Sequence, residues 1–291
     1  MKIATALQAG KQACSFEFFP PKTDAGVEKL LDTARTLLPL KPLFVSVTYG
    51  AAGSSRERTI EVAKRIKREL GLEVLVHVTC IGSSLATLRT LFDELAAAGI
   101  ENILALRGDL PTDGSSAGTF EEFKYANELV AFLAAEYDFC IGAACYPEGH
   151  NESSDIVADV GYLQAKVAAG ANFLITQLFF ENERYRDFVK RARAVGIEVP
   201  IIPGIMPITD YRQVQRFTDL CGATLPEKLR NELVYRADDQ SSVVDLGVAY
   251  ATLQCADLLV HGAPAVHFYT LNRSTATRAI VSALLAANML T

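Results

Sequence analysis

Several absences narrow the function of this 291-residue chain. No block of like charges runs along the sequence, and the formal net charge is −6, which argues against a dedicated nucleic-acid binder. The N-terminus lacks the apolar region of a signal peptide. Charged residues or glycines interrupt the apolar runs before they reach the roughly 18 residues of a transmembrane span. We therefore expect a cytoplasmic protein with no nucleic-acid or membrane partner.

Cysteine and metal-ligand motifs are also missing. The six cysteines form no C-x-x-C pair. A chain of this size needs no disulfide staples, so reduced and mostly buried thiols are expected. Glu148, His150 and Glu152 are residue types that bind metals, but their spacing matches no firm ligand motif and no second His or Cys cluster supports them. We expect no metal.

The usual phosphate-binding loops are absent. No G-x-G-x-x-G follows the first expected strand, and no G-x-x-x-x-G-K-[ST] occurs. A dinucleotide, if bound, is therefore not held in the Rossmann manner. A phosphate-bearing cofactor is still compatible with the sequence, because its site needs only a local cradle of backbone donors.

Short β-branched or aromatic runs alternate with amphipathic helical patterns along the chain. Such alternation implies βαβ units and a parallel sheet. Eight strands are expected, at Cys14–Phe19, Leu43–Thr48, Val74–Thr79, Ile103–Leu106, Phe139–Cys145, Phe173–Phe179, Val199–Ile202 and Ala265–Tyr269. Helices are expected at about 24–38, 56–70, 84–98, 120–136, 153–169, 182–195, 209–219, within 226–260 and at 273–288.

The fold class follows from the number of these units. A (β/α)8 barrel needs about 250 residues, and no linker of domain-joining length interrupts the chain. We predict an α/β protein with one (β/α)8 TIM barrel over residues 1–291; the alternative is a doubly wound open sheet. The active site of a barrel lies at the C-terminal ends of its strands. Pro111–Gly118 follows such an end and is interpreted as a loop on the active side.

Glu17 lies inside the first expected strand, next to Phe16, Phe18 and Phe19. A carboxylate is costly to bury unless it is paired or protonated, and apolar surroundings favour the protonated form. A buried, protonated carboxyl group would suit a general acid. The alternative is a Glu that faces solvent or forms a salt bridge.

The next three strands end in groups that could hold a ligand. Thr48–Ala51 would allow a ligand to approach the backbone, or would form an ordinary turn. His77 and Thr79 share a strand face and could donate to a ligand, although a lone histidine is as often a satisfied core residue. Arg107–Asp109 would need partners near a pocket, which a polar ligand supplies; a surface turn is the alternative.

Later segments carry further candidates. Asp159 and Lys166 fall on one expected helix, where they could reach a shared ligand or be surface charges. Gln177, among aromatic residues, could recognise a heterocycle through its donor and its acceptor. Arg273, close to Tyr269, would suit a substrate carboxylate, with a surface arginine as the alternative.

Eight motifs occur together and in order. They are SFEFFPPKT, FVSVTYGA, HVTC, ALRGDLP, AACYPEGH, GANFLITQLFF, IIPGIMPI and HFYTLNR. Over about residues 14–285 the chain resembles the methylenetetrahydrofolate reductase family, in its short bacterial type with the catalytic domain only. The resemblance implies a barrel with non-covalent FAD that reduces 5,10-methylenetetrahydrofolate to 5-methyltetrahydrofolate, using NADH or NADPH in a ping-pong mechanism. It also implies a homo-oligomer.

The resemblance assigns roles by motif position. Glu17 resembles the general acid, and Asp109 resembles the carboxylate beside flavin and pterin that would tune the flavin potential. The implied FAD-binding residues are Thr48, Tyr49, Ala51, His77, Arg107, Gly108, Asp109, Tyr125, Ala126, Tyr146, His150, Asp159 and Lys166. The implied folate-binding residues are Glu17, Gln177, Gln213, Phe217, Tyr269 and Arg273.

Two other functions are compatible with a barrel. A lyase or aldolase would usually carry a Schiff-base lysine inside a strand, and the eight expected strands contain no lysine. A non-catalytic flavin- or folate-binding barrel would not need both Glu17 and Asp109. The reductase is therefore the favoured prediction.

Overall fold

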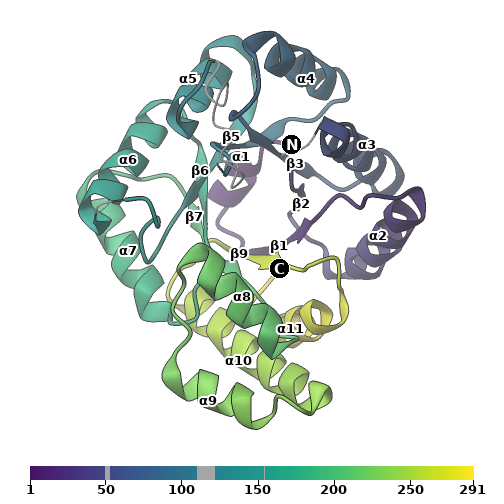
Figure 1. The fold of residues 1–291 in the computed structure, drawn as a ribbon, viewed down its shortest axis with the longest axis vertical. Coiled ribbons are helices and arrows are strands. Elements are labelled where there is room, and N and C mark those ends of the chain that lie inside the picture. The colour runs from purple at the N-terminus through teal and green to yellow at the C-terminus, as the bar shows by residue number, and fades with distance from the viewer. Residues whose placement is uncertain (50–52, 110–121, 154) are drawn as a thin grey trace.

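The computed structural model describes residues 1–49, 53–109, 122–153 and 155–291. Its parallel strands form a ring with helices around the outside, which confirms the predicted α/β class and (β/α)8 barrel (Figure 1). Among the described residues, the strands are β1 (Ala13–Phe18), β2 (Phe44–Val47), β3 (Val74–Thr79), β4 (Asn102–Leu106), β5 (Cys140–Cys145), β6 (Phe173–Thr176), β7 (Ile201–Ile202), β8 (Gly204–Ile205) and β9 (Ala265–Tyr269).

The barrel closes at Pro203. The sheet order is β7-β6-β5-β4-β3-β2-β1-β9-β8, and β7 and β8 are separated only by this proline. Proline has no N–H to donate, so the strand is interrupted there. The residues before Pro203 pair with β6, and those after it pair with β9. The expected single strand Val199–Ile202 is therefore wrong in its bounds, since strand pairing starts later and resumes beyond the proline.

The helices between the strands mostly match expectation. They are α2 (Asp24–Leu37), α3 (Gly53–Leu70), α4 (Leu85–Ala97), α5 (Ala126–Glu136), α6 (Ile156–Ala168), α7 (Asn182–Ala194), α8 (Tyr211–Cys221), α9 (Glu227–Tyr235), α10 (Gln240–Val260) and α11 (Thr275–Ala286), with a short 3-10 helix at Leu38–Leu40. Gly99 and Gly196 follow α4 and α7 at φ 73° and 82°, a conformation that glycine adopts without strain and that ends a helix.

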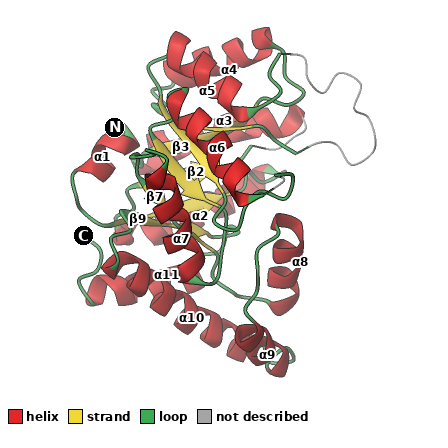
Figure 2. Ribbon diagram, turned by 90° about the vertical axis from the view of Figure 1, so that its left-hand side faces the viewer, coloured by secondary structure: helices red, strands yellow, loops and turns green. Residues whose placement is uncertain are grey.

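The sequence did not predict α1 (Ile3–Gln8), which closes the N-terminal end of the barrel. Ile3 and Leu7 are buried in a cluster with Phe44, Leu75 and Phe173. A six-residue helix is too short to show a clear period, and its stability comes from this packing. Figure 2 shows α1 on the opposite side of the barrel from α8.

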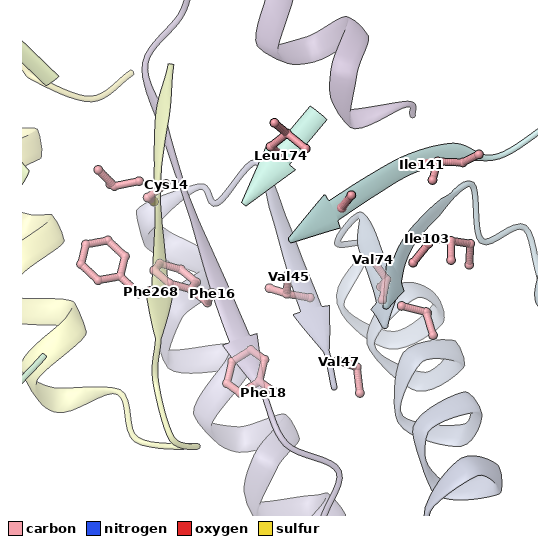
Figure 3. Packing of buried hydrophobic residues seen from close by; sticks show 14 of the residues in the cluster. Cys14, Phe16, Phe18, Val45, Val47, Val74, Ile103, Ile141, Leu174 and Phe268 are labelled. Atoms are coloured by element: carbon pink, nitrogen blue, oxygen red, sulfur yellow. The ribbon is translucent and has the colours of Figure 1, made fainter. Parts of the chain in front are cut away.

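The two faces of each barrel strand have different surroundings. Phe16, Phe18, Val45 and Phe268 belong to the apolar cluster that joins the strands to the outer helices (Figure 3). Since side chains alternate along a strand, Glu17 points the other way, into the barrel. Phe16 and Phe18 therefore do not surround Glu17 in space, contrary to expectation, whereas Phe19 lines the same cavity as Glu17.

Helix α10 is the one described helix that is long and apolar enough to cross a membrane by length and composition, with a mean hydropathy of 1.5. This differs from the expectation that no apolar run is so long, although α10 contains Asp245 and Asp257. Val243, Ala251 and Cys255 are buried within the fold. One such helix is weak support for a membrane span, because a core helix has the same properties.

Candidate active site

A cavity of about 680 Å³ lies at the C-terminal ends of the strands, where a barrel carries its active site. Glu17 from β1, His77 from β3, Gln177 after β6 and Tyr269 from β9 all line it. A smaller cavity of about 420 Å³ lies between residues near the two chain termini and contains none of these side chains. The larger cavity is therefore the candidate active site.

Glu17 is 6% exposed and lies between two imidazoles. Its Oε2 is 3.6 Å from His77 Nε2 and 3.7 Å from His267 Nε2. Burial lowers the pKa of His77 to about 4; the nearby Glu17 opposes this change, and His267 adds to it. His77 is therefore neutral at neutral pH, and the carboxyl group is paired with a neutral ring rather than an imidazolium.

His267 is fully buried, and its other ring nitrogen has a partner. Nδ1 lies 2.8 Å from Ser15 Oγ. Strand register brings the two together, because Ser15 pairs with His267 and Glu17 pairs with Tyr269 across β1 and β9. The ring also stacks on Phe44, with centroids 5.7 Å apart. The imidazole plane is thus held from two sides.

Arg107 and Asp109 follow β4 and line the cavity, with Gly108 between them. The Arg107 guanidinium donates to both carboxylate oxygens of Glu152, at 2.5 and 2.7 Å. Gly108 has φ 92°, and a Cβ there would lie 2.7 Å from Ile81 Cγ2, so only glycine fits without rearrangement. This turn directs the residues on both sides of it toward the cavity.

Tyr146 and His150, which follow β5, form one wall of the cavity with ring centroids 4.6 Å apart. Burial raises the pKa of the Tyr146 hydroxyl, and the negative charge of Asp159 raises it further. Lys166 donates to Ala144 O at 3.1 Å, and its Nζ lies 5.9 Å from the Tyr146 ring centroid. Burial lowers the pKa of Lys166. Asp159 and Lys166 therefore both lie close to Tyr146, although neither lines the cavity itself.

The opposite wall comes from β6, β9 and α8. Strand β6 ends at Thr176, earlier than expected, so Gln177 lies just beyond it, and its Oε1 accepts a hydrogen bond from Leu178 N. The Tyr269 hydroxyl donates to Thr176 O at 2.6 Å. Phe217 lines the cavity from α8. These three side chains face the same space.

Helix α8 is tied to the loop after β5. The Glu148 carboxylate accepts a hydrogen bond from Thr224 N at 3.1 Å, and Asn151 Nδ2 donates to Leu220 O at 3.3 Å. Both bonds hold the C-terminal end of α8 beside the cavity. They position Phe217, which lies one turn before that end.

Most predicted site residues line the cavity. They are Glu17, Thr48, Tyr49, His77, Arg107, Gly108, Asp109, Tyr146, His150, Gln177, Phe217 and Tyr269. The predicted residues that do not line it are Tyr125, Ala126, Asp159, Lys166, Gln213 and Arg273. Ala51 and the expected loop Pro111–Gly118 lie outside the described residues.

Two of these outlying residues depart from their expected positions. Tyr125 is 49% exposed and is the N-cap residue of α5. This helix begins at Ala126, later than the expected start at about residue 120. Arg273 is exposed and precedes α11 by two residues, so it is not at the start of that helix.

His267 and Ser15 were not predicted from the sequence as site residues. His267 is two residues before Tyr269 on one strand, and the rule that paired His77 with Thr79 would have placed them on one face. Ser15 is related to Glu17 in the same way.

Within the described part of the chain, no group of three His, Cys, Asp or Glu residues is arranged to hold a metal ion. Glu148, His150 and Glu152 each have a separate partner. Glu148 accepts from Thr224 N, Glu152 pairs with Arg107, and His150 Nδ1 accepts from Glu152 N at 3.1 Å. The three side chains do not converge.

Comparison with known proteins identifies relatives along the whole barrel. The family model for methylenetetrahydrofolate reductase matches residues 2–285. A 5,10-methylenetetrahydrofolate reductase of Pectobacterium carotovorum subsp. carotovorum is 40% identical over 275 residues, which is 94% of this chain and 91% of the relative. Methylenetetrahydrofolate reductase (NADH) 1 of Arabidopsis thaliana is 36% identical over 283 residues, and the chain spans 48% of that protein.

A solved structure supports the fold. The protein from Clostridium thermocellum described as binding two copies of 5-methyl-5,6,7,8-tetrahydrofolic acid has a TM-score of 0.66 and 15% identity, over 96% of both chains. The family match and the bacterial relative carry the assignment. This chain belongs to the methylenetetrahydrofolate reductase family, as an oxidoreductase of the short bacterial type.

Proposed function

We propose that this protein reduces 5,10-methylenetetrahydrofolate to 5-methyltetrahydrofolate with NADH or NADPH, with Glu17 as general acid. The observation that carries the proposal is a buried carboxyl group at the floor of the strand-end cavity in a chain of this family. A lyase of Schiff-base type is not supported, since the described strands contain no lysine.

The residues in and beside the cavity fit FAD as the cofactor. The Lys166 ammonium has one hydrogen bond to a described residue, to Ala144 O, so its other N–H groups suit an anion such as a phosphate. Next to it, Tyr146 and His150 offer an aromatic and polar wall. We propose that these residues, with Thr48, Tyr49, His77, Arg107, Gly108, Asp109, Tyr125, Ala126 and Asp159, hold FAD non-covalently, and that Ala51 belongs to the same set.

A flavin in this cavity would take hydride from NADH or NADPH and give it to the folate, so that the two substrates would use the site in turn. Asp109 would place a negative charge near the flavin, and a negative charge disfavours the reduced, anionic form of the ring. The residues proposed to orient the folate are Gln177, Gln213, Phe217, Tyr269 and Arg273.

Glu17 supplies the proton. We propose that its carboxyl group protonates a nitrogen of the folate's five-membered ring, which opens that ring and leaves an electrophilic carbon for reduction. Its position at the barrel floor keeps water away from the proton, and Phe217 would cover the pterin by stacking. Both effects favour transfer to the folate over loss to solvent.

The cellular setting is proposed on the same basis. We expect a cytoplasmic homo-oligomer in which residues 1–291 form a single FAD-binding catalytic domain. The partners would be methylenetetrahydrofolate and NAD(P)H, without nucleic acid or membrane.

The test is a pair of half-reactions. Purified protein should be yellow with bound FAD, and anaerobic NADH or NADPH should bleach it. Methylenetetrahydrofolate should then restore the colour with formation of methyltetrahydrofolate. A protein that takes up no FAD, or reduced enzyme that folate cannot reoxidise, would refute the proposal. Comparing the two nicotinamides also decides which one is preferred.

A further inference from the structure

A cluster of polar side chains lies at the floor of the cavity, inside the barrel. It joins Ser15 and Glu17 on β1, His267 on β9 and His77 on β3. Each of these side chains is at least nine-tenths buried. Buried polar atoms in native proteins are nearly always hydrogen-bonded, so those without a partner need an explanation.

Two such atoms point at Glu17. Within the described residues, His77 Nε2 and His267 Nε2 are buried and have no hydrogen-bond partner. Their distances to Glu17 Oε2, 3.6 and 3.7 Å, exceed a hydrogen bond but close with a small side-chain movement. Among the described residues, the ionisable groups placed against Glu17 are these two imidazoles and Tyr269.

The contact with Ser15 distinguishes His267 from His77. When the Ser15 hydroxyl donates to Nδ1, a neutral His267 must carry its proton on Nε2, facing Glu17. That N–H can stabilise a carboxylate. Tyr269 is not free for this role, because its hydroxyl donates to Thr176 O.

We infer that His267, oriented by Ser15, is a positioning residue that holds an N–H toward Glu17 and stabilises the carboxylate left after Glu17 gives its proton to the substrate. The inference rests on the proposed function of Glu17. It assigns the general acid a partner on the neighbouring strand, and it accounts for one of the two orphaned imidazole nitrogens.

Two substitutions separate this role from simple packing. In His267→Gln the amide nitrogen can occupy the place of Nε2 and still donate toward Glu17. In His267→Asn the amide occupies the place of Nδ1, so it keeps the contact with Ser15 but cannot reach Glu17. Ser15→Ala keeps the ring but removes the group that selects its tautomer.

The first measurement is the pH profile of folate reduction. A general acid must be protonated, so the rate falls as pH rises. Loss of a donor to the carboxylate should move this fall by about one pH unit to higher pH in His267→Asn. On the acid side of the profile, where Glu17 is protonated in both proteins, kcat should drop by up to about tenfold, with KM for folate nearly unchanged. His267→Gln should stay close to wild type, and Ser15→Ala should shift in the same direction by less.

The second measurement does not depend on turnover. Glutamate labelled with ¹³C at the side-chain carboxyl would be titrated by NMR, with the Glu17 signal identified by its loss in Glu17→Gln. That signal should titrate at higher pH in His267→Asn than in wild type. If wild-type protein shows no folate reduction, the proposed function fails while this titration still tests the inference.

Matching pH profiles in wild type and both His267 variants would overturn the inference. Equal shifts in the Gln and Asn variants would also overturn it, since they would indicate a packing role. If His267→Asn does not fold, Ser15→Ala decides: an unchanged Glu17 titration in that variant would refute the role of the Ser15–His267 pair.

Discussion

The two ends of the barrel interior differ in the polarity of their side chains. The N-terminal end is filled by apolar side chains, among them Phe44, Leu75 and Phe173, and is closed by Ile3 and Leu7 of α1. The C-terminal end opens into a cavity lined by carboxylates, imidazoles and a guanidinium. Both ends are built from the same strands, often a few residues apart.

The closed end of the barrel mainly contributes to stability, whereas the open end carries the candidate active site. At the closed end, side chains meet well-packed partners. At the open end, Ser46 Oγ, His77 Nε2 and His267 Nε2 are buried without hydrogen-bond partners in the part of the chain that is described. Such unsatisfied groups cost stability, and they are retained where a site needs them. Mutations at the two ends should therefore affect different measurements.

The largest effect is expected from Glu17→Gln at the open end. Losing a general acid should slow folate reduction by about 10²- to 10⁴-fold, while reduction of the flavin by NADH is spared. Stopped-flow measurement of both half-reactions tests this, with the free energy of unfolding as the control. Equal loss in both half-reactions would mean that Glu17 is structural or binds the flavin.

Phe173→Ala at the closed end should do the opposite. Phe173 is fully buried, and its truncation should lower the free energy of unfolding by about 3–5 kcal/mol. Folded enzyme should keep a kcat close to wild type, because the side chain lies away from the cavity. Urea denaturation and steady-state kinetics would be measured on the same sample. A large drop in kcat with unchanged stability would contradict the division between the two ends.

The buried His77 should make stability depend on pH. Its pKa is lowered to about 4, so between that value and the ordinary pKa near 6.5 the unfolded chain binds more protons than the folded one. Stability therefore falls as pH drops through this window, by about 3 kcal/mol in total. In His77→Gln the pH dependence of the free energy of unfolding should be flatter over this range. An identical slope would show that other groups dominate.

The smallest effect is expected from Glu152→Gln. This residue pairs with Arg107 at the open end, but its side chain is 54% exposed, and solvent screens such pairs. The free energy of unfolding should change by less than about 1 kcal/mol. Thermal denaturation at low and high salt would check this, and a larger loss would mean that the open end also contributes to stability.

The alternation of side chains along the expected strands predicted much of the candidate site. The residues that end the strands could be found because a strand alternates its side chains and a barrel collects strand ends at one edge. On that basis Glu17, His77, Arg107, Gln177 and Tyr269 were expected near a ligand, and all line the cavity. Residues on helices were harder, because a helix can turn a side chain away: Gln213 of α8 does not line the cavity, whereas Phe217 of the same helix does.

The sequence by itself determined the family, the barrel and the strand that carries Glu17, because ordered motifs and short-range periodicity are properties of the chain. Only the tertiary structure decided what surrounds that carboxyl group. Sequence neighbours place phenylalanines around it, whereas the register of β1 against β9 and the approach of β3 place His267 and His77 there. The closure of the barrel at Pro203 likewise depends on the pairing of β7 with β6 and of β8 with β9. Strands so far apart in the sequence leave no local pattern that predicts this pairing.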